Sequence, residues 1–158
     1  MSVAFRRESD DEHKEPEYEL PIPVGANLVT PRGLRLLGEE AARLTARIAA
    51  EGAEEARKKL QRRLRYVGTR QATAEVQAPP LGGSAGIGSR VYYRLNGAER
   101  AATIVGHDEA DPAAGRIAFT APLGRALMGS EAGDFADFQG REEAIEIVTV
   151  DNDPEVAA

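Results

Sequence analysis

The sequence contains no cysteine and no tryptophan, and aromatic residues make up only 5% of its 158 positions. The absence of cysteine excludes disulfides, thiolate nucleophiles and thiolate metal sites, and it suits a reducing compartment. No segment approaches the roughly 20 apolar residues that span a bilayer, and the N-terminus lacks the apolar stretch of a signal peptide. We therefore expect a cytoplasmic protein with no membrane partner.

Groups that could carry catalysis are also scarce. The two histidines, His13 and His107, stand in unrelated contexts, and no serine has the surroundings of a nucleophile elbow. The glycine-rich run 82–88 lacks the Lys-Ser/Thr pair with which a phosphate-binding loop ends. We therefore predict that the chain is not an enzyme by itself and holds no cofactor of its own.

Carboxylates crowd together at Asp108, Glu109 and Asp111. They lack the alternating ligands and the closing glutamate of a calcium-binding loop, so we predict no metal site there. Pro112 and Gly115 follow them, as is typical of a turn. The sequence therefore predicts a solvent-exposed acidic turn.

The segment 1–27 is polar and carries seven acidic residues against three basic ones. The acids are Glu8, Asp10, Asp11, Glu12, Glu15, Glu17 and Glu19. Such a composition buries too little apolar surface to order a chain, so we expect an acidic, flexible tail. Pro21 and Pro23 exclude a helix through its last part.

Residues 28–76 predict an antiparallel helical hairpin. Thr30 followed by Pro31 is a typical helix start, and Gly52 separates two helical runs. Apolar residues recur every three or four positions in both runs, which indicates two seams that pack on each other. The seam positions are Leu34, Leu37, Ala41, Leu44 and Ile48 in the first run, and Ala56, Leu60, Leu64, Val67 and Gln71 in the second.

The second run is strongly basic although the whole chain has a formal charge of −6. Its cations are Arg57, Lys58, Lys59, Arg62, Arg63, Arg65 and Arg70, against only Glu54 and Glu55. Two interpretations remain open on the residues alone. The face contacts phosphates or an acidic protein groove, or it is a solvated helix face.

The rest of the chain predicts a small sheet with one helix, so the fold class is α+β. Residues 77–88 form a Pro/Gly-rich linker, residues 89–151 the second domain and residues 152–158 a short tail. Strands are expected at 90–95, 99–105, 116–120 and 144–150, with a helix at 122–128. Asn96-Gly97 predicts a tight hairpin turn between the first two strands.

Several linked motifs stand at consistent spacing in the C-terminal half: Ile104–Pro112, Gly115–Ile117, Pro122–Gly129 and Gly133-Asp134. Together they resemble the C-terminal domain of the GreA/GreB family of bacterial transcription elongation factors. Leu28–Leu34 and Arg62–Val67 look like the two helices of the family's coiled coil, so the resemblance covers about residues 28–150. It implies an FKBP-like C-terminal domain that docks on RNA polymerase and a coiled coil that enters its secondary channel.

The resemblance also assigns roles to residues. It implies polymerase binding by Thr120, Pro122, Leu123 and Arg125, and contact with the channel, or with RNA or DNA in the elongation complex, by Arg57, Lys58, Arg62 and Arg65. In the family, acids at the coiled-coil tip help to hold a magnesium ion of the polymerase active site and promote cleavage of backtracked RNA. The candidate acids in this chain are Glu51, Glu54 and Glu55.

Three departures from the family pattern leave the mechanism open. The family's Asp-Leu-Ser-Glu-Asn-Ala-like tip motif is missing, and Thr120-Ala121-Pro122 replaces an acidic-Ser-Pro sequence before the short helix. The hairpin is also expected to turn at residues 49–55, which makes its coiled coil shorter than the usual arm of the family. The hypotheses are stimulation of RNA cleavage, occupancy of the channel without cleavage, or a coiled-coil adaptor for other proteins. A prolyl isomerase, suggested by the FKBP-like fold alone, is disfavoured because so few aromatic residues could line a pocket.

Overall fold

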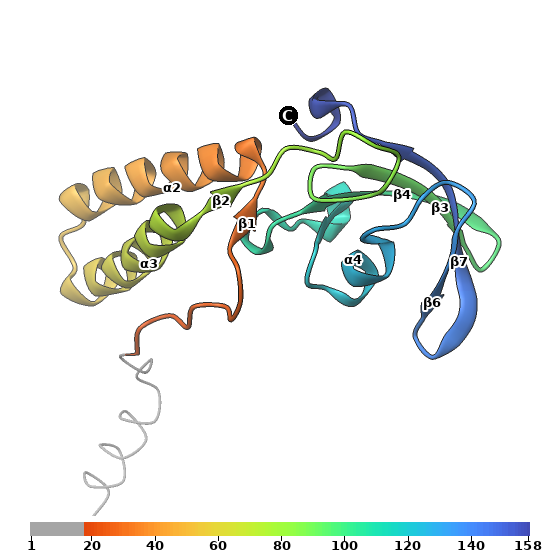
Figure 1. Ribbon diagram of the computed structural model, residues 1–158. Helices are drawn as coiled ribbons and strands as arrows, with labels where there is room; N and C mark the ends of the chain where they lie inside the picture. Colours follow the sequence, from red (N-terminus) through yellow and green to blue (C-terminus); the bar gives the residue numbers. More distant parts are fainter. Residues whose placement is uncertain (1–17) are drawn as a thin grey trace, which may run out of the picture.

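A computed structural model of the chain describes residues 18–158. Most of the predicted acidic tail, residues 1–17, therefore lies outside the described residues. The described part consists of a helical hairpin followed by a β-sheet domain with a short helix, as the sequence predicts (Figure 1). The turn of the hairpin lies at the end remote from the sheet.

The hairpin is formed by α2 (Pro31–Ala50) and α3 (Glu54–Thr73). The predicted start of α2 is confirmed: Thr30 is the N-cap, its hydroxyl accepts a hydrogen bond from the Gly33 amide at 2.9 Å, and Pro31 follows. A proline costs nothing there because its missing N–H would have had no helical partner.

The seam between the helices is shorter than the apolar spacing predicts. Leu37, Leu44, Tyr66 and Val67 are buried, with Ala41, Leu60 and Leu64 packed against them. The predicted positions Ala56 and Gln71 are exposed, so the seam prediction is wrong at both ends of α3. Tyr66 takes part instead, which the three-four spacing did not include.

A two-stranded parallel sheet closes the base of the hairpin. β1 (Leu28–Val29) pairs with β2 (Glu75–Val76), and the Glu75 amide donates to the Asn27 carbonyl oxygen at 2.8 Å. Strands of two residues leave no periodic pattern in a sequence, and these two were not predicted.

The second domain is a five-stranded sheet in the order β5-β4-β3-β7-β6. Its strands are β3 (Arg90–Leu95), β4 (Ala98–Val105), β5 (Arg116–Ala118), β6 (Phe135–Phe138) and β7 (Arg141–Asp151). All neighbours are antiparallel except β4 and β5. The predicted turn is confirmed, because Asn96 and Gly97 both have positive φ angles, of 52° and 74°. β6 was not predicted, and β7 begins three residues earlier than expected.

The short helix α4 (Pro122–Leu127) packs over the sheet and contributes the fully buried Leu127 to its core. Gly124 permits this packing, since a Cβ there would lie 2.0 Å from the Ala118 carbonyl oxygen. The remaining buried residues of this core are Ala85, Ile87, Val91, Tyr93, Ala102, Ile104, Ile145 and Ile147.

Residues 77–88 have no helix or strand, and their second half packs on the sheet through Ala85 and Ile87. In the described part of the chain, three short 3-10 helices complete the fold: η1 (His107–Glu109), η2 (Pro112–Ala114) and η3 (Pro154–Ala157). Among residues 18–158, no helix has the length and apolarity required to cross a bilayer.

Candidate functional site

The acidic turn predicted to face solvent is in fact the junction between the hairpin and the sheet domain. Glu109 is only 7% exposed, and the side chain of Asp108 only 10%. Both lie in η1, between β4 and β5, and both bond to residues of the hairpin or of the segment before it. The prediction of a solvated turn is therefore wrong for Asp108 and Glu109, because it assumed that acids next to a proline have no distant partners, whereas Asp111 is exposed as predicted.

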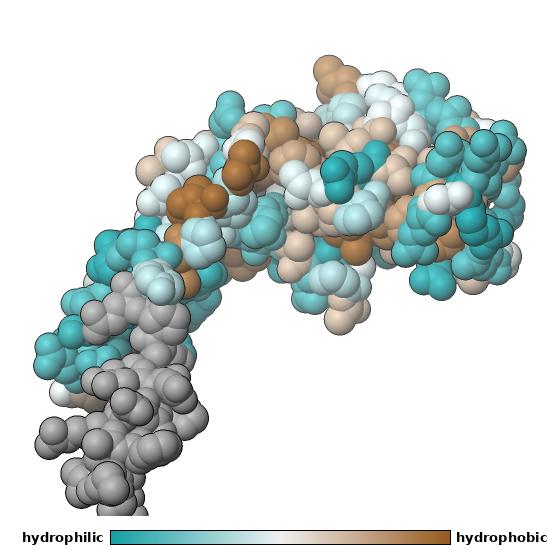
Figure 2. All heavy atoms as spheres, turned by 90° about the horizontal axis from the view of Figure 1, so that it is seen from below, coloured by the Kyte–Doolittle hydropathy of each residue, from teal (hydrophilic) through white to brown (hydrophobic). Residues whose placement is uncertain are grey.

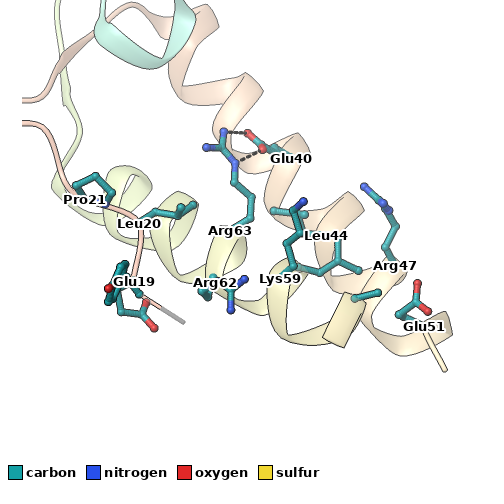
Figure 3. A pocket seen from close by; sticks show the side chains of 13 residues that line it. Glu19, Leu20, Pro21, Glu40, Leu44, Arg47, Glu51, Lys59, Arg62 and Arg63 are labelled. Atoms are coloured by element: carbon teal, nitrogen blue, oxygen red, sulfur yellow. Dashed lines mark hydrogen bonds and ion pairs between the residues drawn. The ribbon is translucent and has the colours of Figure 1, made fainter. Parts of the chain in front are cut away.

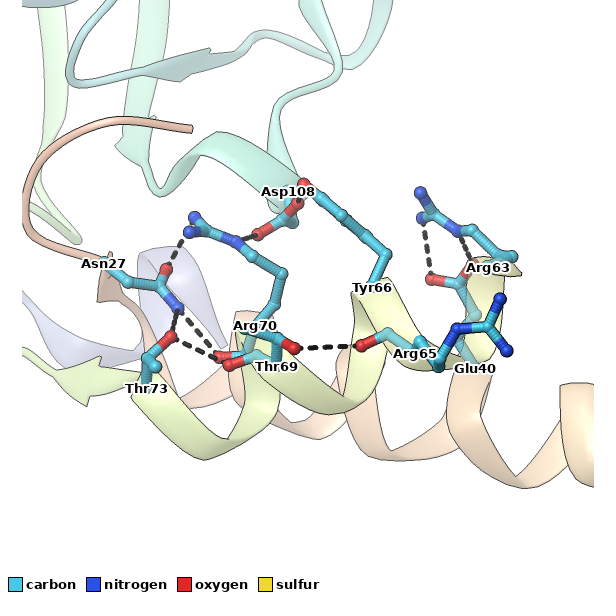
Figure 4. A network of polar contacts seen from close by, with 9 residues as sticks. All are labelled: Asn27, Glu40, Arg63, Arg65, Tyr66, Thr69, Arg70, Thr73 and Asp108. Atoms are coloured by element: carbon cyan, nitrogen blue, oxygen red, sulfur yellow. Dashed lines mark hydrogen bonds and ion pairs between the residues drawn. The ribbon is translucent and has the colours of Figure 1, made fainter. Parts of the chain in front are cut away.

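Asp108 receives two hydrogen bonds from α3. The Tyr66 hydroxyl donates to Oδ1 at 2.5 Å, and Arg70 Nε donates to Oδ2 at 2.7 Å (Figure 4). Burial, together with the bond to Asp108, raises the pKa of Tyr66 to about 12. The Arg70–Asp108 pair is almost fully enclosed, so neither charge has water as an alternative partner.

Glu109 reaches the N-terminus of α2. The Thr30 hydroxyl donates to Oε1 at 2.5 Å, and Arg32 Nη1 donates to Oε2 at 2.9 Å. Gly33 makes room for this carboxylate, since a Cβ on Gly33 would lie 2.9 Å from Oε1. A carboxylate at a helix N-terminus is also favoured by the helix dipole.

Asn27 adds a third link. Its Oδ1 accepts from Arg70 Nη2 at 2.8 Å, and its Nδ2 donates to the Arg70 carbonyl oxygen at 2.7 Å and to Thr73 Oγ1 at 3.1 Å. We call Asn27, Thr30, Arg32, Tyr66, Arg70, Asp108 and Glu109 the basal network. It joins three segments far apart in the sequence and positions the hairpin on the sheet domain.

The candidate acids Glu51, Glu54 and Glu55 lie together at the hairpin turn. Glu51 is the C-cap of α2 and its Oε1 accepts from the Ala53 amide at 3.0 Å. Glu54 and Glu55 lie in the first turn of α3, where their side chains are 72% and 86% exposed, and each is within 4 Å of Lys58 Nζ. Within residues 18–158, no group of three or more acids and histidines is arranged to hold a metal ion.

The basic residues of α3 divide into inward and outward sets. Arg70 belongs to the basal network, and Arg63 binds Glu40 of α2 at 2.7 Å, a hydrogen bond that raises the pKa of Arg63. Arg65 is half exposed and binds Glu19 in a bidentate pair at 2.7–3.1 Å. The candidate contacts Arg57, Lys58 and Arg62 lie on the same helix, with partly exposed side chains.

The candidate docking residues gather around α4. Thr120, Pro122 and Arg125 are exposed, and Leu123 is partly buried against the core. The N-cap Ala121 offers no side-chain acceptor to the helix, as expected from the departure at this position. Thr120 also borders a small cleft of about 70 Å³ that His107 and the segment 23–26 share.

A larger groove of about 720 Å³ lies on the outer half of the hairpin. Leu44 and Leu60 are among its apolar lining, and Arg47, Lys59 and Arg62 are among its cations (Figure 3). The segment Tyr18–Pro21 forms one wall. Sequence reasoning missed this groove, because it treated residues 18–27 as part of a tail without partners.

Comparison with known proteins gives a family match in the sheet domain. Residues 80–152 match the family model described as transcription elongation factor, GreA/GreB, C-term. The matched range contains η1, α4 and all five strands of the sheet.

Similar curated proteins are named transcription elongation factor GreA. The protein of Bacillus cereus is 46% identical over 57 residues, which are 35% of this chain and 36% of that protein. The protein of Thermomicrobium roseum is 43% identical over 53 residues, 34% of each chain. The chain thus spans about a third of the length of these relatives.

Two solved structures resemble the chain over a larger part at lower identity. A GreA/GreB elongation factor from Nitrosomonas europaea is 22% identical, covering 81% of this chain and 99% of its own, with a TM-score of 0.39. GreA factor homolog 1 of Thermus thermophilus is 17% identical, covering 80% and 99%, with a TM-score of 0.38.

Proposed function

Through residues 80–152 the chain belongs to the GreA/GreB family, and on this premise we propose that it binds bacterial RNA polymerase in the cytoplasm and regulates elongation from the secondary channel. The family match of the sheet domain carries the proposal. The exposed positions of Thr120, Pro122 and Arg125 support docking through α4, because these side chains are available to a partner without unfolding.

The hairpin is suited to enter a narrow channel. Each arm has 20 residues, about 30 Å at a rise of about 1.5 Å per residue. The basal network fixes the direction in which the hairpin leaves the sheet domain. Docking of the sheet domain would therefore also determine where the turn and the basic face of α3 are placed.

Binding is tested by measuring the affinity of the chain for bacterial core polymerase. Arg125→Glu reverses an exposed charge beside α4 and should weaken binding about tenfold, the scale of one lost charge contact. Arg100→Glu makes the same change on β4, away from α4, and should leave the affinity unchanged. A wild-type chain that does not associate with core polymerase overturns the proposal.

Within this function, we propose occupancy of the channel as the basic mechanism, with stimulation of RNA cleavage as an added activity of the turn acids. Occupancy of the channel requires only the helical hairpin. Cleavage would require Glu54 or Glu55 to reach the magnesium ion of the polymerase, and their exposure at the turn supports this role. Glu51 is less suited, because its carboxylate already caps the turn.

Release of short 3′ fragments from a stalled, backtracked complex separates the two mechanisms. If the acids act, the chain accelerates release, and alanine at Glu51, Glu54 and Glu55 together removes the gain while polymerase affinity stays the same. Alanine at three exposed acids elsewhere, Glu75, Glu142 and Glu143, is the matched control. A wild-type chain that binds without accelerating release leaves occupancy as the only mechanism.

The adaptor hypothesis receives no support from the seam. Leu37, Leu44, Leu60 and Leu64 pack within one hydrophobic cluster of the hairpin, so they are engaged with each other. A coiled-coil platform for another protein would need these side chains on its surface. Contact with RNA or DNA through Arg57, Lys58, Arg62 and Arg65 remains part of the polymerase proposal.

A further inference from the structure

The groove on the hairpin is already lined at one end by the chain itself. From the basal network at Asn27, the chain continues back to Tyr18 without helix or strand, and we call residues 18–26 the strap. Figure 3 shows its residues Glu19, Leu20 and Pro21 beside α3. Leu20 and Pro21 lie along the groove, and Glu19 binds Arg65. The strap thus combines an apolar contact with an acid-to-arginine pair.

Figure 2 shows a mainly hydrophilic hairpin surface, interrupted by apolar atoms near the point where the described chain begins. The strap contributes Tyr18, Leu20 and Ile22, which are 75%, 39% and 44% exposed. Leu60 of the groove floor is also incompletely covered. Part of the strap and of the groove floor is therefore open to solvent.

The acidic run, residues 8–17, leads directly into the strap. It holds six acids, Glu8, Asp10, Asp11, Glu12, Glu15 and Glu17, and one base, Lys14. Arg62 lies beside Glu19, and Arg47 and Lys59 lie at the groove nearer to the turn (Figure 3). Ten residues reach at most about 33 Å, slightly more than the length of an arm of the hairpin.

We propose that the acidic run binds the groove of its own hairpin and covers the basic face of α3 in the free protein. The described pair between Glu19 and Arg65 is the first contact of this series, and the run would repeat it toward the turn. Because the run is tethered beside its site, its effective concentration is high, and single contacts that are weak in water add up. The proposal does not depend on the function proposed above.

A spin label tests the contact directly, and the chain has no cysteine that would compete for it. Ser9→Cys carries the label in the acidic run, and the amide lines of the isotope-labelled protein are compared before and after reduction of the nitroxide. We expect selective broadening at Leu44, Arg47 and Leu60. The broadening should disappear at about 1 M salt, where screening acts over roughly 3 Å.

Neutralisation provides the matched comparison. Exchange of the six acids for their amides should abolish the broadening, whereas Glu142→Gln with Glu143→Gln, which removes acids from β7, should not change it. Arg47→Gln removes a cation of the groove and should reduce the broadening. None of these substitutions touches the seam, and the amide spectrum itself reports whether each variant is folded.

Three outcomes are distinguishable. Broadening within one molecule supports the proposal. In a second sample, spin-labelled chains without isotope are mixed with isotope-labelled chains without a spin label. Broadening that appears only in this mixture assigns the groove to a second copy of the chain and overturns the proposal. No broadening at low salt also overturns it. If the chain binds polymerase, removal of residues 1–17 should further raise that affinity about tenfold, and a failure of polymerase binding leaves the label measurement valid.

Discussion

At the scale of single residues, Tyr66 gives the basal network a dependence on alkaline pH. Burial raises its pKa from the ordinary 10.0 to about 12, so the unfolded chain loses this proton first as pH rises. The stability due to the neutral phenol is therefore complete below pH 10 and is lost toward pH 12. We expect the free energy of unfolding to fall across this window.

Tyr66→Phe should flatten that fall and lower stability at pH 7 by about 1.5–3 kcal/mol, the value of a hydrogen bond to a charged group. Urea denaturation at pH 7 and at steps between pH 9 and 12 measures both effects. Burial also raises the pKa of Tyr93, so the variant keeps a smaller decrease of stability with pH. An unchanged slope in Tyr66→Phe would contradict the assignment.

Replacement of two helix glycines by alanine should change the stability of the protein in opposite directions. In a helix interior, alanine is ordinarily better than glycine by about 1 kcal/mol. A Cβ added at Gly68 would meet no atom within 4 Å, so Gly68→Ala should stabilise the protein. Gly33→Ala should destabilise it, since its Cβ would press on Glu109 Oε1. Thermal unfolding of both variants checks the prediction, and a stabilised Gly33→Ala would refute it.

The role of Asp108 and Glu109 shows what local sequence could not provide. Their neighbours Pro112 and Gly115 favour a turn, and a turn is what forms. Whether its acids face water depends on Arg70 and Thr30, which are 38 and 79 residues away along the chain. Only the fold brings these partners together, so composition near the turn gave a wrong answer.

At the scale of elements, local chemistry predicted well where it determines the structure. The cap at Thr30, the break near Gly52 and the turn at Asn96-Gly97 act within a few residues, and all three are confirmed. β1, β2 and β6 were missed because two to four residues carry too little pattern and need distant partners to form. Tyr66 was missed in the seam for a related reason: its partner is Asp108, outside the hairpin.

The start of α2 should be sensitive to the hydroxyl of Thr30. This side chain accepts from the Gly33 amide and donates to Glu109, so it joins the cap to the basal network. Thr30→Ala removes both bonds and should cost about 1–3 kcal/mol. Thr30→Ser keeps the hydroxyl and should cost clearly less, as measured by urea denaturation. Equal losses in the two variants would mean that the methyl group, and not the hydroxyl, matters.

At the scale of the whole molecule, two acid-arginine pairs with the same shortest distance of 2.7 Å should differ strongly in their effect on stability. Arg70–Asp108 is enclosed, with 4% and 10% of the side chains exposed, whereas Arg65–Glu19 is open, at 55% and 64%. Asp108→Asn leaves a buried guanidinium without its counter-charge and should cost about 3–5 kcal/mol. Glu19→Gln should leave the unfolding temperature nearly unchanged, because water and salt screen that pair.

The same substitution at Asp108 should loosen the hairpin from the sheet domain. Besides the basal network, contacts that join the two parts include those of α2 and β1 with η1 and the packing of Leu28 against the core of the sheet domain. Spin labels at Ala49→Cys and Ala98→Cys, both exposed, report the distance from the hairpin turn to the far end of the sheet. We expect one narrow distance distribution in the parent chain and a broad one with Asp108→Asn, while Glu19→Gln keeps it narrow. If the distribution stays narrow without the Asp108 charge, the remaining contacts, including the bonds of Glu109 to Thr30 and Arg32, fix the hairpin on the sheet domain. The direction in which the hairpin would enter a channel then does not depend on the buried pair.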